Sequence, residues 1–446
     1  MQDKLNDNNF RMATVATIDT NGLLRGQKVS RSNLEGILKN GMGMAPAQLA
    51  LDPTDAILPL PGVTDDSGSF NDSMLQVDQD SCCSIPFEAP GHDLLFLAQF
   101  SGEYAALCPR SILSNVIKRG KAMGITPKYG MELEYTLFNE TSASLQDKGF
   151  RNLQPATAHA SHDLVIYQAA QSDWYKDVVE MCEPLGIDLI KMHEEIGPGF
   201  MEACIGPGKD LETADQAVLL KNFLRVLAMK QDKTITFMPR WSEQADSQSS
   251  HIHTSLLGND GTPLFWDASK PDNMSDTFRH FVGGLQKYLG AMMLLFAPTV
   301  NSYRRFVEGT FAPPALSWGI ENRTTCFRIV GEDPSSIRVE NRLPGADTNP
   351  YLTMAATLAA GYAGIAEKCQ PSAAVVGNGY LPGTTDGLEF PHQMSNAIAA
   401  LRASEHAKQW LGERFVEGYA TSREGQLAEF QSKVPDTELM RFFELG

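Results

Sequence analysis

Segments in which charged and apolar residues alternate impose the strongest constraint on how this chain folds. Glu132 and Glu134 occupy alternate positions of "MELEYTLF", and His251, His253 and Ser255 do the same in "SHIHTSLL". Side chains two positions apart point to the same face of a β-strand. The apolar residues between them would cover a core, so we expect strands with one polar face and one buried face.

A third segment, "IRVENRLP", combines a carboxylate with arginines on one strand face. Arg338, Glu340 and Arg342 alternate in it, while Ile337 and Val339 fall on the opposite face. This pattern predicts another strand whose polar side chains join the first two sets.

A fourth segment, "HEEIGPGFMEACIG", contains a turn. The run from Gly197 to Gly199 would fold the segment into a hairpin or tight loop. Glu194 and Glu202 are then expected to lie across from each other.

Any one of these sets, taken alone, is most simply the solvent-exposed face of an antiparallel strand. Together they align carboxylates and a histidine with interleaved arginines. Oxygen-rich sites suit Mg²⁺ or Mn²⁺, and Mn²⁺ also accepts an imidazole. A divalent cluster beside arginines is what the phosphates of a nucleotide require. Because the sequence contains no Gly-x-x-x-x-Gly-Lys-Ser/Thr loop, we expect side chains and metal ions on a sheet to hold those phosphates.

The length of 446 residues exceeds that of a typical single core and predicts two domains. Residues 1–105 are rich in short β-like runs and turns, so they would form a small sheet domain, and residues 106–446 the larger domain. In the first, "MATVATIDTNGLLRGQKVS" reads as a hairpin, and "DAILPLPG" and "DLLFLAQF" read as short strands. The irregular mixture of strands and helices favours an α+β fold over a doubly wound sheet.

Several helices are expected from their start and stop signals. Pro109 in the first turn and Gly124 past the end mark the first of them. The helix expected at 211–229 opens with Thr213 and Gln216 at the spacing of a capping box. Further helices are expected at 172–185, 275–296, 350–367 and 393–412.

The overall charge and the terminal sequence exclude several classes of partner. The formal net charge is −17, and no basic stripe appears, so we expect small anionic ligands and no nucleic acid. No apolar run approaches the ~20 residues of a membrane span, and the N-terminus lacks the layout of a secretion signal. The seven cysteines are odd in number and fit no metal cage, which predicts reduced thiols in a cytoplasmic protein.

These segments, in this order, resemble the glutamine synthetase family, and the resemblance extends from about residue 10 to the end of the chain. It implies a small β-grasp-like N-terminal domain beside a large catalytic domain with a curved antiparallel sheet flanked by helices. It also implies a homododecamer of two stacked hexamers, with active sites between neighbouring subunits. In such enzymes ATP phosphorylates the γ-carboxylate of glutamate, and ammonia or an amine then displaces the phosphate.

The resemblance also assigns roles to residues of this chain. It implies that one metal ion, nearer glutamate, is held by Glu134, Glu194 and Glu202. It implies that a second metal ion, nearer the ATP phosphates, is held by Glu132, His251 and Glu340.

Arginines and nucleotide-side residues are assigned in the same way. Arg323, Arg328 and Arg338 would handle the phosphates, with His253 and Ser255 at nucleotide-side positions. Arg305, in "NSYRRFV", would clamp the glutamate carboxylate, and Arg342 would lie near the γ-carboxyl and its phosphate.

The chain departs from the ammonia-using pattern at the amine site. Where such enzymes carry Gly-x-Glu-Ala-Pro, this chain has Gly309 to Pro313 with Phe311 in place of the glutamate, and Glu308 precedes the glycine. The region "GMGMAPAQLALDPTD" lacks the Asp-Gly-Ser that supplies a second carboxylate, and Asp246-Ser247 stands where Asn-Gly is usual. An aromatic ring favours an amine with an organic group, through apolar or cation–π contact.

We therefore interpret the chain as a γ-glutamyl-amide ligase that uses ATP, glutamate and an organic amine, with Phe311 as the gate of the amine pocket. Three alternatives remain open at this point: a glutamine synthetase with an atypical ammonium site, a catalytically inactive structural member of the superfamily, and a non-ligase nucleotide-binding regulator, for which the sequence contains no positive motif.

Overall fold

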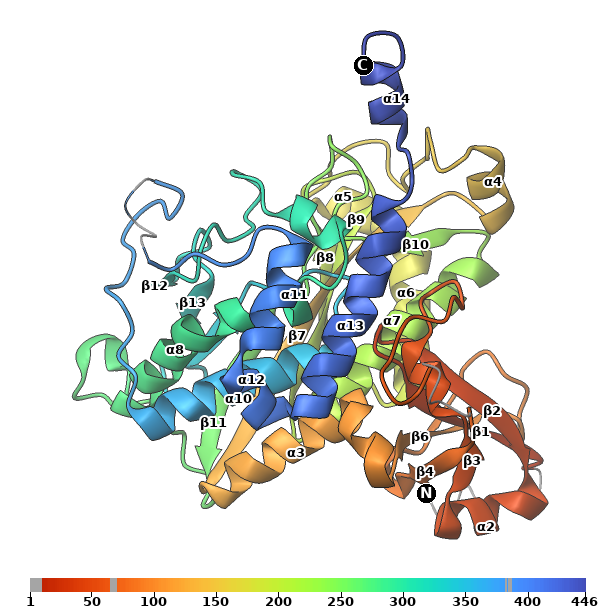
Figure 1. Cartoon of the computed structure of the whole chain (residues 1–446), viewed down its shortest axis with the longest axis horizontal. Helices are drawn as coiled ribbons and strands as arrows, with labels where there is room; N and C mark the ends of the chain where they lie inside the picture. Colours follow the sequence, from red (N-terminus) through yellow and green to blue (C-terminus); the bar gives the residue numbers. More distant parts are fainter. Residues whose placement is uncertain (1–9, 65–69, 382, 384–386) are drawn as a thin grey trace.

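The computed structural model describes residues 10–64, 70–381, 383 and 387–446. Two β-sheets, formed by successive parts of the chain, define the architecture (Figure 1). The smaller sheet, drawn in red to orange, lies beside a large α+β body in which helices flank a long curled sheet. The α+β class expected from the sequence is confirmed.

The N-terminal sheet has the order β2-β1-β6-β4-β3, with β5 also paired to β6. Its strands and helix are β1 (Met12–Ile18), β2 (Leu24–Ser30), α2 (Arg31–Asn40), β3 (Met42–Met44), β4 (Ser73–Val77), β5 (Cys83–Ser84) and β6 (Leu94–Phe100). β1 runs parallel to β6, and the other pairs are antiparallel. The predicted hairpin and the strand "DLLFLAQF" are confirmed, but "DAILPLPG" is not a strand, because only an isolated bridge joins Leu51 to Ile57.

The large sheet has the order β12-β13-β14-β11-β7-β9-β8, with β10 on β7. Its strands are β7 (Ile125–Phe138), β8 (Leu189–Glu194), β9 (Phe200–Lys209), β10 (Thr234–Thr236), β11 (Ile252–Gly258), β12 (Trp318–Ile320), β13 (Phe327–Val330) and β14 (Arg338–Asn341). Every pair is antiparallel except β12 with β13.

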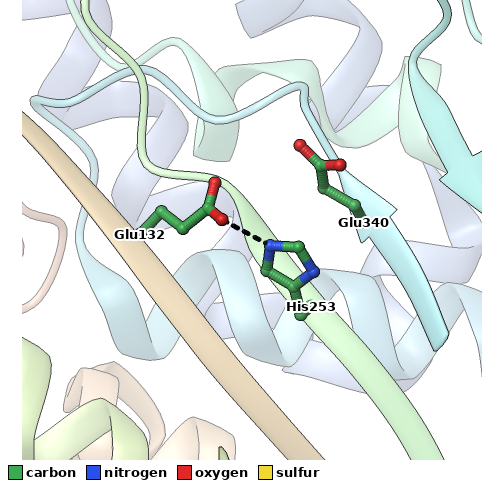
Figure 2. A group of neighbouring side chains, drawn as sticks. All are labelled: Glu132, His253 and Glu340. Atoms are coloured by element: carbon green, nitrogen blue, oxygen red, sulfur yellow. Dashed lines mark hydrogen bonds and ion pairs between the residues drawn. The ribbon is translucent and has the colours of Figure 1, made fainter. Parts of the chain in front are cut away.

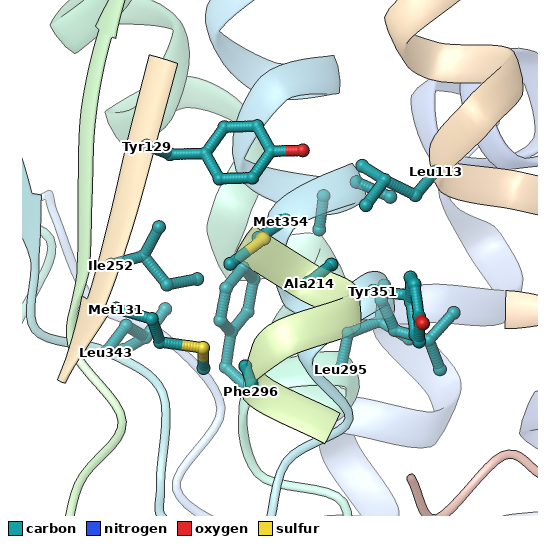
Figure 3. Close-up of a cluster of buried hydrophobic side chains, with 14 of the residues drawn as sticks. Leu113, Tyr129, Met131, Ala214, Ile252, Leu295, Phe296, Leu343, Tyr351 and Met354 are labelled. Atoms are coloured by element: carbon teal, nitrogen blue, oxygen red, sulfur yellow. The ribbon is translucent and has the colours of Figure 1, made fainter. Parts of the chain in front are cut away.

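The apolar face of this sheet rests on helices. Tyr129 and Met131 of β7 and Ile252 of β11 are buried against Ala214 and Met354, which belong to two of those helices (Figure 3). The charged residues that alternate with them in sequence therefore point to the other face, as the strand period predicts.

The helices of the described chain are α3 (Pro109–Ala122), α4 (Ser142–Asp147), α5 (Val165–Ala170), α6 (Ser172–Leu185), α7 (Glu212–Lys230), α8 (Asp276–Tyr288), α9 (Met293–Phe296), α10 (Pro350–Glu367), α11 (Met394–Ala403), α12 (Glu405–Leu411), α13 (Glu413–Gln431) and α14 (Asp436–Phe442). α10 is buried along most of its length. It begins at Pro350, and Asn349 caps it by accepting hydrogen bonds from the backbone of Tyr351 and Leu352. A Cβ on Gly364 would lie 2.5 Å from Gly284 Cα, so α10 and α8 touch through their glycines. None of the helices in the described ranges has the length and apolarity needed to cross a membrane.

Two predicted helices are divided, and one predicted cap is wrong. Ser404 accepts a hydrogen bond from Ala407 N at 3.1 Å and starts α12, so the helix expected at 393–412 becomes two. The helix expected at 275–296 gives way after α8 to a 3₁₀ turn that contains Gly290. At α7, Thr213 donates to Tyr129 O of β7, and Gln216 accepts from the backbone N of Asp188, which precedes β8. Both side chains are therefore engaged by tertiary partners and do not cap the helix.

Buried polar contacts join the small sheet to the large body. The turn between β1 and β2 meets two helices: Asn349 donates to Asp19 O, and Asn222 donates to Gly22 O, each at 3.0 Å. Arg110 bridges Asp78 and Asp215 from the two parts. We retain a domain boundary near residue 105 as a proposal.

Candidate active site

A cavity of about 770 Å³ opens on the polar face of the large sheet. Residues of β7, β8, β9, β11, β13 and β14 and of the loops beside them line it. Eleven of the side chains to which the sequence analysis gave site roles lie on its wall, namely Glu132, Glu134, Glu202, His251, His253, Ser255, Phe311, Arg323, Arg328, Arg338 and Arg342.

Strand register explains how residues far apart in sequence meet. Glu340 of β14 pairs with His253 of β11 on one side and with Arg328 of β13 on the other. Side chains of directly opposed residues share a face. Glu132 of β7 reaches the same group, because its Oε1 lies 2.9 Å from His253 Nε2 (Figure 2). Its Oε2 lies 3.1 Å from His251 Nδ1.

The electrostatics of this group keep two carboxylates ionised. Burial would raise the pKa of Glu340, but Arg342 and then His251 outweigh it and lower the pKa to about 2. Burial likewise opposes ionisation of Glu132, yet His253 and His251 hold its pKa well below the usual value. Glu132, His253 and Glu340 place ligand atoms within 4.8 Å of one another, which is metal-site spacing.

His253 has its tautomer set by its neighbours. Arg338 Nε donates to His253 Nδ1 at 3.1 Å, and an arginine has no acceptor atom. Nδ1 therefore accepts this hydrogen bond, which leaves Nε2 as the ring nitrogen that donates to Glu132. Arg338 thus orients a carboxylate through the histidine.

A second group lies between β7 and β9. Glu134 Oε2 accepts from Ser249 N at 2.6 Å, and Glu134, Glu202 and His251 place ligand atoms within 4.8 Å. Burial, and then the charges of Glu132 and Glu134, raise the pKa of Glu202 well above its usual value. A bound cation would reduce the repulsion between carboxylates that lie this close together. The oxygen-rich donor set with one imidazole fits Mg²⁺ or Mn²⁺.

Glu194 does not lie where the sequence analysis expected. In the β8–β9 pairing, His193 is opposite Glu202, whereas Glu194 is opposite Met201 on the other face. Glu194 is fully buried, and neither carboxylate oxygen has a hydrogen-bond partner among the described residues. The prediction that it lies across from Glu202 is wrong because it shifts the register by one residue.

Glu195 takes that place and was missed from the sequence. Its Oε1 lies 3.1 Å from His193 Nε2, and its side chain lines the cavity. His193, Glu195 and Glu202 bring ligand atoms within 4.8 Å of one another. The alternation of His193 and Glu195 was the available signal, since residues two apart share a strand face.

The arginines occupy two kinds of environment. Arg328 contacts Glu340 at 3.0 Å and also pairs with Glu321, Arg342 pairs with Glu340, and Arg323 is exposed on the cavity wall. The side chains of Arg323, Arg328 and Arg342 all line the cavity.

Arg305 is not on that wall. It is 2% exposed, and its two terminal nitrogens donate to Leu343 O and Arg342 O at 2.9 Å each. Arg305 was expected to bind the glutamate carboxylate, but in this structure it stabilises the backbone that directly follows β14.

The loop with Phe311 lies on the wall as well. Phe311 is 48% exposed and has a φ of 55°, and Glu308 is exposed and not among the lining residues. Asp246 and Ser247 also line the cavity. From this loop, the residues that line the cavity therefore include the aromatic Phe311 and not the acidic Glu308.

A curled antiparallel sheet that gathers carboxylates, histidines and arginines in one cavity is a known type of catalytic domain. The model of the glutamine synthetase catalytic domain matches residues 106–442. The chain belongs to the glutamine synthetase family.

Relatives and solved structures agree with this assignment. Type-1 glutamine synthetase 2 of Dictyostelium discoideum is 32% identical over 97% of this chain and 83% of its own length. Gamma-glutamylethanolamide synthetase GlnA4 of Streptomyces coelicolor is 31% identical (96% and 91%), and glutamate–isopropylamine ligase of a Pseudomonas species is 28% identical (100% and 97%). A structure of GmaS in complex with ADP has a TM-score of 0.84 at 24% identity and covers 98% of this chain and 97% of its own, which shows the shared fold.

Proposed function

We propose that this protein is an ATP-dependent ligase that joins glutamate to an organic amine and forms a γ-glutamyl amide through γ-glutamyl phosphate. The observation that carries the proposal is Phe311 on the cavity wall, where ammonia-using relatives would place a carboxylate. Relatives named as isopropylamine and ethanolamide ligases span almost the whole chain and support it.

The reaction requires two displacements. A γ-carboxylate oxygen of glutamate attacks the γ-phosphorus of ATP, and ADP leaves. The amine nitrogen then attacks the acyl carbon, phosphate leaves, and the nitrogen loses a proton. Both steps depend on charge neutralisation and positioning more than on covalent help from the protein.

Two sets of residues would hold the divalent ions. We assign Glu134, Glu195 and Glu202 to one ion, with Glu195 replacing Glu194 of the sequence-based assignment. We assign Glu132, His251 and Glu340 to the other. Bound Mg²⁺ or Mn²⁺ supplies charge neutralisation at the phosphoryl oxygens.

The arginines around the cavity would bind the anionic groups. Arg323, Arg328 and Arg338 would contact the phosphates, and Arg342, which already pairs with Glu340, would face the acyl phosphate. His253 and Ser255 lie on the same wall and would form the nucleotide side. Arg305 would support Arg342 through its backbone carbonyl.

The amine would enter beside Phe311. Its carbon skeleton would cover the exposed part of the ring, and cation–π contact would favour its charged form by ~0.5–2 kcal/mol. Asp246 lines the same cavity and provides a negative charge there.

An amine panel tests the proposal. Purified protein with ATP, Mg²⁺ and glutamate would be supplied with ammonium, methylamine, isopropylamine, ethanolamine, putrescine or aniline, and ADP release measured. We expect at least one organic amine to exceed ammonium in kcat/KM. Equal or better use of ammonium would instead support a glutamine synthetase. Absence of ADP release with every mixture would support an inactive structural member.

We further propose a cytoplasmic homododecamer of two stacked hexamers. The C-terminal segment with α14 projects from the body (Figure 1) and exposes Met440 and Phe443, at 79% and 83%. Exposed apolar side chains of this kind are typical of a surface that another subunit covers. Light scattering of the chain truncated after Gln431 tests this, because we expect a smaller assembly.

A further inference from the structure

Side chains from two other parts of the chain hold two successive backbone carbonyls of the Phe311 loop. Arg342 donates to Phe311 O at 3.4 Å, and the Tyr380 hydroxyl donates to Ala312 O at 3.0 Å. The Arg342 contact comes from the end of β14, and the Tyr380 contact comes from the segment that follows α10. The loop is therefore clamped at the residue whose ring faces the cavity and at the next one.

The backbone of Phe311 needs such support. Its φ of 55° is in the left-handed region, which an aromatic residue adopts only when its surroundings impose it. Ala312 is 2% exposed, whereas Phe311 is 48% exposed. The Ala312 carbonyl, which accepts the hydrogen bond from Tyr380, is thus at the buried end of the loop. A hydrogen bond at this point fixes the orientation of Phe311, the exposed residue next to it.

Tyr380 is itself anchored to the turn that carries Arg323. Asn322 Nδ2 donates to Gly377 O at 2.8 Å, and Gly379 N donates to Thr324 Oγ1 at 2.8 Å. A Cβ on Gly379 would lie 2.6 Å from Thr324 O, so only glycine allows this approach. The hydroxyl of Tyr380 therefore connects the Phe311 loop to the part of the cavity wall that contains Arg323.

We propose that Tyr380 is a positioning residue that sets the size limit of the amine by fixing Phe311 through the carbonyl of Ala312. The proposal rests on the proposed amine ligase function. Tyr380 does not line the cavity, so it acts through the loop and not by contact with substrate. Burial raises the pKa of Tyr380, and the hydroxyl therefore stays protonated and able to donate.

The test removes only the hydroxyl, by Tyr380→Phe. The ratio of kcat/KM for isopropylamine to that for aniline would be measured at saturating ATP and glutamate. Loss of one neutral hydrogen bond predicts a change of about fivefold in this ratio, with the KM for glutamate unchanged. Tyr104→Phe is the matched control, because Tyr104 lies in the N-terminal part and outside the cavity wall.

A second readout does not depend on turnover. Thr310 N and Val307 N donate to backbone carbonyls within the loop, so hydrogen exchange of residues 306–313 reports on its order. We expect faster exchange there in Tyr380→Phe and not in Tyr104→Phe. If no amine supports ADP release by the wild type, the ligase proposal fails, while the exchange result still decides whether Tyr380 holds the loop. Unchanged exchange, or an unchanged amine ratio in an active variant, overturns the role of Tyr380.

Discussion

Truncating Phe311 to alanine removes the ring that we place against the amine. The ring of a phenylalanine offers roughly 200 Å² of surface, and 48% of Phe311 is exposed to the cavity and solvent. On the order of 100 Å² is therefore left for a ligand, and an organic group would cover about half of it. At about 25 cal/mol per Å², that contact contributes about 1.2 kcal/mol, or close to an eightfold effect on kcat/KM.

The expected result is selective. Phe311→Ala should lower kcat/KM for isopropylamine and aniline by about eightfold and leave methylamine and ammonium nearly unchanged. Phe311→Leu is the matched control, because it keeps apolar area at the same place. Phe311→Glu should move the preference toward ammonium by restoring a carboxylate. Initial rates of ADP release across the panel measure all three variants, and an amine profile that stays the same in Phe311→Ala and Phe311→Glu would refute the placement of this loop.

Further predictions concern the carboxylates and the thiol beside them. Glu340→Ala should abolish ATP turnover by removing a proposed metal ligand, and retained ADP release would contradict the metal assignment. Glu195→Gln should weaken Mn²⁺ binding at least tenfold in isothermal titration, and Glu194→Gln much less, since of these two acids Glu195 lines the cavity beside Glu202. A larger loss in Glu194→Gln than in Glu195→Gln would favour the sequence-based assignment. The Cys204 sulfur lies 3.2 Å from Glu202, so Cd²⁺ should bind with a thiolate absorption band that Cys204→Ser lacks, while Mg²⁺ affinity is unchanged. The folded pKa of Glu340, about 2, is below its unfolded value near 4.5. The ionised carboxylate therefore stabilises the metal-free fold above about pH 5, and this stabilisation is lost as the pH falls toward 2. Acid unfolding of Glu340→Gln should lack this pH-dependent component.

Much of the architecture follows from local sequence patterns. The alternation in β7, β11 and β14 determines which side chains leave the core, and the helices at 172–185 and 350–367 have their predicted bounds. The cap expected at Thr213 failed because a tertiary partner, Tyr129 O, competes for the same hydroxyl. Local patterns do not reveal such long-range competition.

The site was predictable to the level of residue type and strand face. Glu194 and Glu195 are adjacent acids, and only the β8–β9 register decides which of them meets Glu202. The brace formed by Arg305 depends on carbonyls near residue 342 that no motif indicates. The hydrogen bond from the Tyr380 hydroxyl likewise could not be predicted from local spacing, because its acceptor is 68 residues away in the sequence.

The strand order of the large sheet has a consequence for how the chain acquires its cavity. β7 pairs with β11, which starts more than 110 residues later, and β11 pairs with β14, which ends at Asn341. Contacts of such high sequence separation form slowly, and loop-closure entropy must be overcome before they stabilise anything. During synthesis, the edge of β7 that pairs with β11 therefore stays unpaired until β11 has been made. Nucleotide and metal would then bind only the completed sheet, and their addition should raise the midpoint of thermal unfolding.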